Sequence, residues 1–234
     1  MPEPGPLIAS GRDCDVFAYG DGLVLRRSRA GRSIAHEARI MEHVADLGYP
    51  VPRVHDVLDD GAALVLDRID GPSMLDAIAR RPWTLWRSAA ALARLHHQLH
   101  DLAAPEWLPA FPTAPGAQIG HFDLHPINVL LSSRGPVVID WTNAAAAAPA
   151  TDVAMSWILL ASGGVDGGGA KLLLLRVARQ RFVNAFLSHF ARPQIAAQLD
   201  AVVTYKSHDP NMSAAEIATM RALALRESDT ATKG

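Results

Sequence analysis

The chain has 234 residues, of which 49% are apolar and 20% are charged. This composition is enough to bury a sizeable core, which excludes disorder over the whole chain, and the length allows one large domain or two small lobes. With 22 basic and 24 acidic residues, the net charge of −2 argues against a nucleic-acid binder or a polybasic membrane binder, because both depend on clustered positive charge. No apolar run reaches the roughly 20 residues that span a bilayer. The first residues lack the basic and apolar regions of a secretory signal, and Cys14 is the single cysteine, so we expect a cytoplasmic protein.

The first third of the chain reads as short strands around one helix. Four β-prone runs form two pairs, each separated by a turn that contains Asp and Gly: residues 15–19 with 23–26, and 54–57 with 62–66. Between the pairs, apolar residues at three- and four-residue spacing predict a helix that ends near Leu47 and has Ser33 as its N-cap. A polar connector with Gly and Pro follows over residues 67–72 and marks a lobe boundary.

The remainder of the chain is predicted to be mostly helical. Apolar stripes predict helices over residues 84–102, 150–160 and 171–190, and Ser213 to Glu216 form a capping box that opens a last helix. Three stretches between or after these helices are expected to be irregular or flexible: the proline-rich segment 103–120, the glycine-rich segment 162–169 and the tail 229–234.

The most informative stretch runs from His121 to Trp141. It contains two short apolar runs separated by Ser-Ser-Arg-Gly, which predicts a hairpin. If the hairpin turns about Arg134, Asn128 and Asp140 are equally far from the turn and face each other at the open end. Their amide and carboxylate oxygens are hard ligands of the kind that Mg²⁺ uses when it binds nucleotide phosphates. Asp123 lies on the loop that feeds this hairpin, where it can accept a proton from an incoming hydroxyl.

A positioning carboxylate with metal ligands beside it is what phosphoryl transfer needs. The motif His-x-Asp-Leu-His-Pro-x-Asn, which begins at His121, is followed by Ile-Asp-Trp, which begins at Ile139. Together they resemble the motifs of the aminoglycoside phosphotransferase/choline kinase family. The resemblance implies a bilobal kinase-like α+β fold, with a small strand-rich N-lobe and a mainly helical C-lobe. It also implies transfer of the γ-phosphate of ATP or GTP to a hydroxyl of a small molecule. In that scheme Asp123 is the catalytic base, and Asn128 and Asp140 hold Mg²⁺.

The resemblance extends outward from this motif. In the family pattern a basic residue holds the nucleotide phosphates, and Arg26 corresponds to it. A glutamate pairs with that basic residue, and Glu37 corresponds to this glutamate. The hinge beside the adenine corresponds to a stretch that includes Leu66, Asp67 and Ile69. An aspartate expected to brace the catalytic loop matches Asp152.

Further residues are assigned to the surroundings of the site. His121 and His125 are interpreted as side chains that brace the catalytic loop, and Asn143 as a possible part of the acceptor pocket. Trp141 either lines that pocket or packs in the core. His96 and His100 have the spacing of zinc ligands on a helix, but no acid accompanies them in the sequence, so no zinc site is expected.

The chain also departs from the family pattern. Phe122 and Ile127 stand where glycine is frequent, and Thr142 stands where an acidic residue often follows Ile-Asp-Trp. The segment Ser10–Asp13 is not a glycine-rich phosphate loop. That departure keeps open a non-catalytic nucleotide-binding or scaffold protein on the same fold.

The sequence therefore predicts an N-lobe over residues 1–67, a hinge over 68–71 and a C-lobe over 72–228. The predicted partner is a small-molecule hydroxyl acceptor. The sequence does not identify this acceptor, and it leaves the oligomeric state open.

Overall fold

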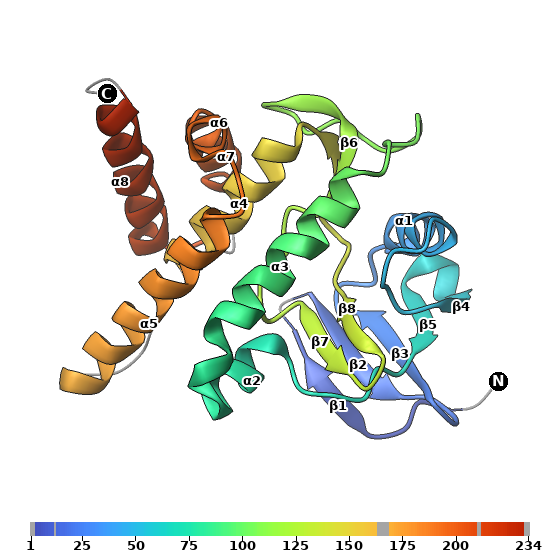
Figure 1. Ribbon diagram of the computed structural model, residues 1–234. Coiled ribbons are helices and arrows are strands. Elements are labelled where there is room, and N and C mark those ends of the chain that lie inside the picture. Colours follow the sequence, from blue (N-terminus) through green and yellow to red (C-terminus); the bar gives the residue numbers. More distant parts are fainter. Residues whose placement is uncertain (1–2, 12, 163–168, 210–211, 232–234) are drawn as a thin grey trace. The chain divides into compact units, whose positions relative to one another are not determined.

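In the computed structural model, the described residues are 3–11, 13–162, 169–209 and 212–231 (Figure 1). The chain forms two compact units, one made of residues 1–73 and 128–144 and the other of residues 74–127 and 145–234. The second unit begins just after the predicted hinge. The hairpin segment 128–144 belongs with the N-terminal unit, whereas the sequence interpretation assigned it to the C-lobe.

The first unit is built on a five-stranded antiparallel sheet with the strand order β1-β2-β3-β5-β4. Its strands are β1 (Leu7–Ser10), β2 (Cys14–Ala18), β3 (Leu23–Ser28), β4 (Val54–Leu58) and β5 (Ala63–Asp67). Both predicted strand pairs are confirmed as hairpins, β2 with β3 and β4 with β5. In the first hairpin Gly20 and Gly22 adopt φ values of 58° and 71°, which glycine reaches without steric cost. A short 3-10 turn, η1 (Asp59–Gly61), joins the second pair.

The helix between the two hairpins is α1 (Ala35–Asp46), which buries Ile40, Met41 and Val44. The prediction of Ser33 as its N-cap is wrong. The N-cap is Ile34, which makes no side-chain cap bond. The Ser33 hydroxyl instead accepts a long hydrogen bond of 3.4 Å from the backbone N–H of Ala35, because the chain enters the helix one residue later than its polar pattern suggests.

The hairpin predicted between His121 and Trp141 consists of β7 (Val129–Ser132) and β8 (Gly135–Val138). Its register differs from the predicted one, because Ser132 faces Gly135 across a two-residue turn that is not centred on Arg134. Gly135 makes this tight turn possible, since its φ of 125° is strained for other residues. Asn128 is therefore opposite Ile139, whose backbone N–H donates to the Asn128 carbonyl at 3.0 Å, and Asp140 lies one residue further on.

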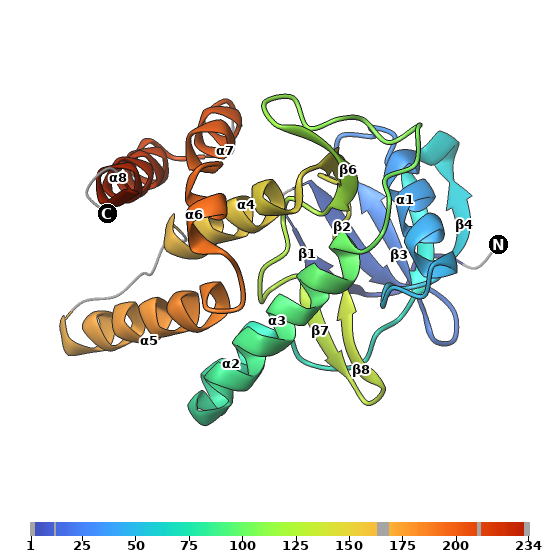
Figure 2. The same cartoon turned by 45° about the horizontal axis from the view of Figure 1, so that its top comes forward.

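The second unit is mainly helical (Figures 1 and 2). It contains α2 (Met74–Arg80), η2 (Pro82–Thr84), α3 (Leu85–His100), α4 (Pro149–Ser162), α5 (Gly169–Leu187), α6 (Arg192–Ala196), α7 (Leu199–Lys206) and α8 (Ala214–Ala231). Helices α3 and α5 run side by side, and α4 packs against α5, α6, α7 and α8. Most residues of helix α4 are buried, which agrees with its mainly apolar sequence.

Three expectations for this unit need correction or completion. The segment predicted as irregular contains β6 (Pro115–Gly120), which pairs with β9 (Ala145–Ala147) far along the chain. The predicted tail 229–234 is helical as far as Ala231, and residues 232–234 lie outside the described residues. Residues 163–168 of the predicted glycine-rich segment also lie outside them. In the first unit, Arg12 of the segment Ser10–Asp13 likewise lies outside the described residues.

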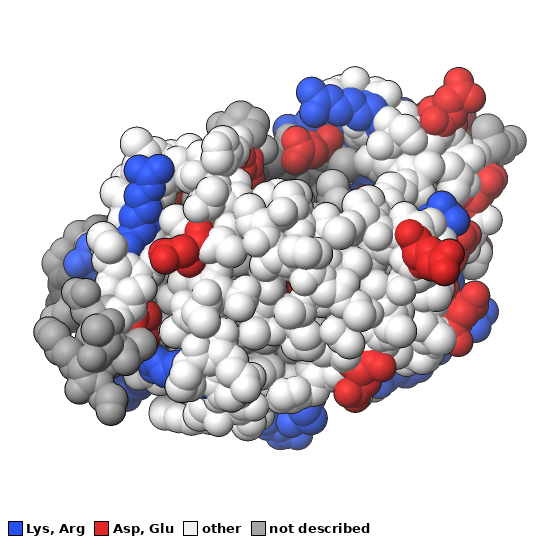
Figure 3. Space-filling model, turned by 90° about the horizontal axis from the view of Figure 1, so that it is seen from above, with Lys and Arg blue, Asp and Glu red and all other residues white. Residues whose placement is uncertain are grey.

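The capping box before α8 is confirmed. The backbone N–H of Glu216 donates to the Ser213 hydroxyl at 3.2 Å, and the backbone N–H of Ser213 donates to the Glu216 carboxylate at 2.9 Å. On the face drawn in Figure 3, acidic and basic side chains are scattered among uncharged residues. No helix in the described part of the chain is long and apolar enough to cross a membrane.

Candidate active site

An arginine and two carboxylates meet in the first unit. Arg26 lies on β3, and its side chain is only 14% exposed. Its Nε donates to Glu37 Oε2 at 3.2 Å, and its Nη2 donates to Asp140 Oδ1 at 2.7 Å. Glu37, on α1, has a side chain only 2% exposed. The structure thus brings together Arg26, Glu37 and Asp140, three of the residues singled out in the sequence, although Arg26 and Asp140 are 114 positions apart.

Thr142 and the backbone of Trp141 complete this cluster. The Thr142 hydroxyl lies 3.0 Å from Asp140 Oδ1 and 3.3 Å from Glu37 Oε2, and it accepts from Arg26 Nη2 at 3.2 Å. The Trp141 backbone N–H donates to Glu37 Oε1 at 3.3 Å. The sequence interpretation treated Thr142 only as the loss of an acidic residue. In the structure it links all three charged groups.

The charges of the cluster depend on each other. Burial works against the charged form of Arg26, but Glu37 and Asp140 more than compensate, so the pKa of the guanidinium is raised well above its usual value. Burial raises the pKa of the Glu37 carboxyl, which Arg26 opposes and the like charge of Asp140 reinforces. Arg26 is therefore a permanent cation, and it is what allows two carboxylates to lie close together in a largely buried place.

Asp140 adopts an uncommon backbone conformation, with φ of 66° in the left-handed region. Non-glycine residues reach this region at a cost of about 1–2 kcal/mol, and such residues cluster at functional sites. Asn128, just before the first strand at the same open end of the hairpin, is buried. An amide oxygen and a carboxylate at the end of one hairpin are a donor set that suits Mg²⁺, and the Asp140 carboxylate already binds a cationic group here.

The predicted hinge residues are largely engaged within the sheet. Leu66 is paired with Val24 and Val54 inside the ladder. The Asp67 backbone N–H donates to the Arg53 carbonyl at 3.0 Å, and its carboxylate lies 2.7 Å from His55 Nε2. The N–H of Asp67 is thus used inside the unit. Contact of Leu66, Asp67 and Ile69 with a nucleotide stays a prediction.

Trp141 packs in the core of the first unit. Its side chain is fully buried, its ring meets Tyr49 edge-on at 5.5 Å, and its Nε1 donates to the Val138 carbonyl at 3.2 Å. Of the two alternatives for Trp141, the structure supports packing, and its assignment to an acceptor pocket is withdrawn. Asn143 is exposed, and its assignment to that pocket stays a prediction.

Asp123 lies in the second unit, on the loop after β6. His125 Nε2 is 3.4 Å from the Oδ1 atom of Asp123, and the backbone N–H of Asp123 donates to His121 Nδ1 at 3.2 Å. Burial alone would raise the pKa of this carboxyl, but its hydrogen bond with His125 and electrostatic interactions with His125, His121 and Lys206 lower the pKa below its ordinary value. Asp123 is therefore ionised at neutral pH. The bracing of this loop by His121 and His125 stays a prediction.

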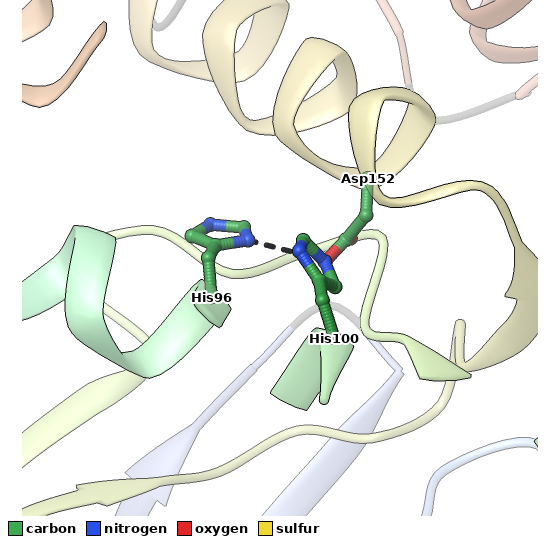
Figure 4. A group of neighbouring side chains, drawn as sticks. All are labelled: His96, His100 and Asp152. Carbon is green, nitrogen blue, oxygen red and sulfur yellow. Dashed lines mark hydrogen bonds and ion pairs between the residues drawn. The ribbon is translucent and has the colours of Figure 1, made fainter. Parts of the chain in front are cut away.

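Asp152, at the start of α4, contacts the same loop. Its Oδ1 accepts from the Phe122 backbone N–H at 2.7 Å, which agrees with the predicted bracing. Its Oδ2 lies 3.2 Å from His96 Nδ1 and 2.9 Å from His100 Nε2 (Figure 4). The expectation that no acid accompanies these histidines is thus wrong, because the acid comes from a helix more than 50 residues away.

The family model described as the phosphotransferase enzyme family matches residues 5–119 and 77–197. The chain belongs to the phosphotransferase enzyme family. No curated protein sequence matches this family member significantly.

Solved structures share the fold of this phosphotransferase at low sequence identity. A thermostable mutant of aminoglycoside phosphotransferase APH(4)-Ia, in a ternary complex with AMP-PNP and hygromycin B, has 13% identity and a TM-score of 0.65, covering 95% of this chain and 93% of that chain. ADP-bound APH(2'')-Ib has 13% identity and a TM-score of 0.60, with coverages of 94% and 91%. A choline/ethanolamine kinase family protein from Mesorhizobium loti has 17% identity and a TM-score of 0.56, with coverages of 96% and 87%. The α+β kinase-like fold predicted from the sequence is confirmed.

Some residues of the site were missed by sequence reasoning. Thr142 was set aside as a departure from a pattern. Ser156 lies four residues beyond the matched Asp152 on α4, and Lys206 lies in a helix without a recognised motif. Nothing local marks these residues. Only the folded chain brings Lys206 within electrostatic range of Asp123 and Ser156 within hydrogen-bonding range of the loop.

Proposed function

We propose that this phosphotransferase moves the γ-phosphate of ATP or GTP to a hydroxyl group of a small molecule in a Mg²⁺-dependent reaction. The cluster of Arg26, Glu37 and Asp140 is the observation that supports this most strongly. It supplies a permanently charged cation for phosphate oxygens, a buried carboxylate that orients this cation, and a hard oxygen ligand for a metal.

The site residues of the first unit each have a role in the proposed reaction. Arg26, held by Glu37, binds the nucleotide phosphates, and backbone groups of the stretch that includes Leu66, Asp67 and Ile69 lie beside the base. Asn128 and Asp140 hold Mg²⁺, which when bound neutralises the negative charge of the phosphates. Arg26 Nη2 donates a hydrogen bond to Asp140 in the structure. When the nucleotide and Mg²⁺ bind, this guanidinium must therefore turn from Asp140 towards the phosphates.

Asp123 receives the acceptor hydroxyl. Its lowered pKa makes it a weak base, so its main contribution is to orient the hydroxyl through a hydrogen bond and to take the proton late in the transfer. This suits phosphoryl transfer, in which the bond to the leaving group is largely broken before the nucleophile needs to lose its proton. His121 and His125 fix the loop that carries this carboxylate, and Asn143 is proposed to contact the acceptor.

The test compares Asp123→Asn with wild type and with Asp101→Asn, an exposed aspartate of the same unit, as the matched control. With ATP and GTP and a panel of hydroxyl compounds, Asp123→Asn is expected to reduce transfer by about 10²–10⁴-fold, the typical contribution of an acid–base group. Nucleotide affinity, measured by calorimetry, should stay close to that of wild type. If the Asp123→Asn enzyme transfers phosphate at the control's rate, the assigned role is wrong. Nucleotide binding without any transfer in wild type would instead support the non-catalytic alternative.

A further inference from the structure

Helix α4 holds the backbone on both sides of Asp123. On one side Asp152 Oδ1 accepts from the Phe122 N–H at 2.7 Å, and on the other the Ser156 hydroxyl donates to the Leu124 carbonyl at 2.8 Å. Asp152 and Ser156 are four residues apart, so they project from one face of the helix. Both side chains are fully buried, and these hydrogen bonds therefore act without competition from water.

His96, on α3, joins the two side chains that hold the loop. Its Nδ1 lies 3.2 Å from Asp152 Oδ2, and its Nε2 lies 3.1 Å from the Ser156 hydroxyl. Its ring is fully buried and packs at 5.4 Å from Phe186. Figure 4 shows His96 and His100 from α3 on one side of the group and Asp152 from α4 on the other. The network therefore ties two helices to the loop that carries Asp123.

The loop needs this support because its backbone is strained. Phe122 adopts φ of 58°, in the left-handed region that a side chain other than glycine enters at a cost of about 1–2 kcal/mol. Part of the compensation comes from its ring, which stacks on Phe111 at 4.1 Å with an interplanar angle of 2°. Hydrogen bonds to the Phe122 N–H and to the Leu124 carbonyl, one residue on either side of Asp123, also hold the loop in this conformation.

We propose that Ser156 and His96 are positioning residues that set the orientation of Asp123 for the acceptor hydroxyl. This inference rests on the proposed function of Asp123. Ser156 fixes the Leu124 carbonyl, and His96 holds Ser156 and Asp152 in the geometry that the loop requires. Neither residue touches the reacting groups, so their effect is on the rate of transfer and not on nucleotide binding.

His96, His100 and Asp152 also lie close enough to hold a metal ion, since one ligand atom from each is within 4.8 Å of the others. The hydrogen bonds favour the positioning role. Both carboxylate oxygens of Asp152 and both ring nitrogens of His96 already have partners inside the protein. No polar atom of these two side chains is left to indicate a missing ligand.

The test is Ser156→Ala, with Ser162→Ala as the matched control. Ser162 is on the same helix and is also buried, and its hydroxyl donates a similar bond of 2.7 Å to the Ile158 carbonyl, away from the loop. Ser156→Ala is expected to lower kcat by about tenfold, with KM for ATP unchanged, since one buried hydrogen bond that matters to the transition state has this scale. Ser156→Thr, which keeps a hydroxyl, should restore most of the rate.

A second variant examines the histidine. His96→Asn retains a polar group near Nδ1 but has nothing at the position of Nε2, so it should lower kcat by a similar factor. The double variant with Ser156→Ala should lose no more than either single variant, because both break the same link. Thermal unfolding of each variant identifies any that fails to fold. If His96→Asn does not fold, His96→Gln, which keeps a group near Nε2, is expected to retain more activity than Ser156→Ala.

The outcomes separate this inference from the proposed function. Amide hydrogen exchange of the segment 121–125 should speed up in Ser156→Ala but not in Ser162→Ala, whether or not the enzyme transfers phosphate. If Ser156→Ala matches Ser162→Ala in both kcat and exchange, the positioning role is wrong even when Asp123→Asn is inactive. The positioning role would also be wrong if the purified wild-type protein contained stoichiometric zinc that is absent from His100→Ala, because the ring nitrogens of His96 and His100 would then bind the metal.

Discussion

Removal of the Arg26 side chain is the sharpest perturbation of the first unit. In Arg26→Ala, the Glu37 carboxylate, only 2% exposed, loses the charged donor Arg26 and keeps the like charge of Asp140 nearby. Breaking a buried ion pair on one side costs about 3–5 kcal/mol, because the remaining charge stays buried without a partner. Protonation of Glu37 limits this cost to about 1.4 kcal/mol for each pH unit between its pKa and the working pH.

Arg27→Ala is the matched control. Arg27 is the next residue on the same strand, but its side chain is 43% exposed and its partner Asp59 is 53% exposed, at 3.3 Å. Such a surface pair contributes about 0–1 kcal/mol. Urea unfolding at pH 7.5 should therefore show Arg26→Ala to be less stable than Arg27→Ala by at least about 2 kcal/mol.

Two further measurements test the cause of this difference. Burial raises the pKa of Glu37, and loss of Arg26 raises it further, so Glu37 takes up a proton more readily in the variant. The penalty of Arg26→Ala should accordingly be smaller at pH 5 than at pH 7.5. The double variant Arg26→Ala/Glu37→Gln should recover part of the loss, because it removes the stranded charge. Equal stability of Arg26→Ala and Arg27→Ala, at both pH values, would refute the reasoning.

Three more predictions concern other parts of the fold. Although burial opposes it, hydrogen bonds from His100 and His96 hold the pKa of Asp152 well below its ordinary value, so the stability that this carboxylate contributes is present above about pH 4 and is lost as the pH falls through its folded pKa. Asp152→Asn should flatten the acid side of a plot of unfolding free energy against pH, and an unchanged slope would contradict this. Ser213→Ala removes the capping box of α8 and should cost about 1 kcal/mol in urea unfolding, whereas a change of less than a few tenths would show that the cap is unimportant. Gly71→Ala places a Cβ against the Leu131 carbonyl at a φ of 153°, so its melting temperature should fall clearly below that of wild type.

The parts of the fold that follow local signals were predictable from the sequence. The turn of Gly20 to Gly22 and the capping box at Ser213 each depend on residues a few positions apart, and both are confirmed. Strand β6 was missed because its partner β9 is a run of alanines, which has no β-strand pattern of its own.

The site was predictable in its residue types but not in its geometry. The motif identified Asp140 and the wider family resemblance identified Arg26 and Glu37, and in the structure Arg26 contacts both carboxylates. The hairpin register was wrong by one residue, because Ser-Ser-Arg-Gly is compatible with more than one turn and Gly135 selects the tighter one. The contact of His96 with Asp152 joins residues 56 positions apart, and no spacing rule predicts a contact made by the packing of two helices.

Phosphorus NMR of the wild-type protein with ATP, Mg²⁺ and a mixture of small hydroxyl compounds tests the proposed function most directly. The proposal predicts that the γ-phosphate signal declines while a phosphate-ester signal grows, and that neither change occurs when Mg²⁺ is replaced by a chelator. If no ester forms with any hydroxyl compound, with ATP or with GTP, although the protein binds the nucleotide, the assignment of this chain as an active small-molecule kinase is wrong.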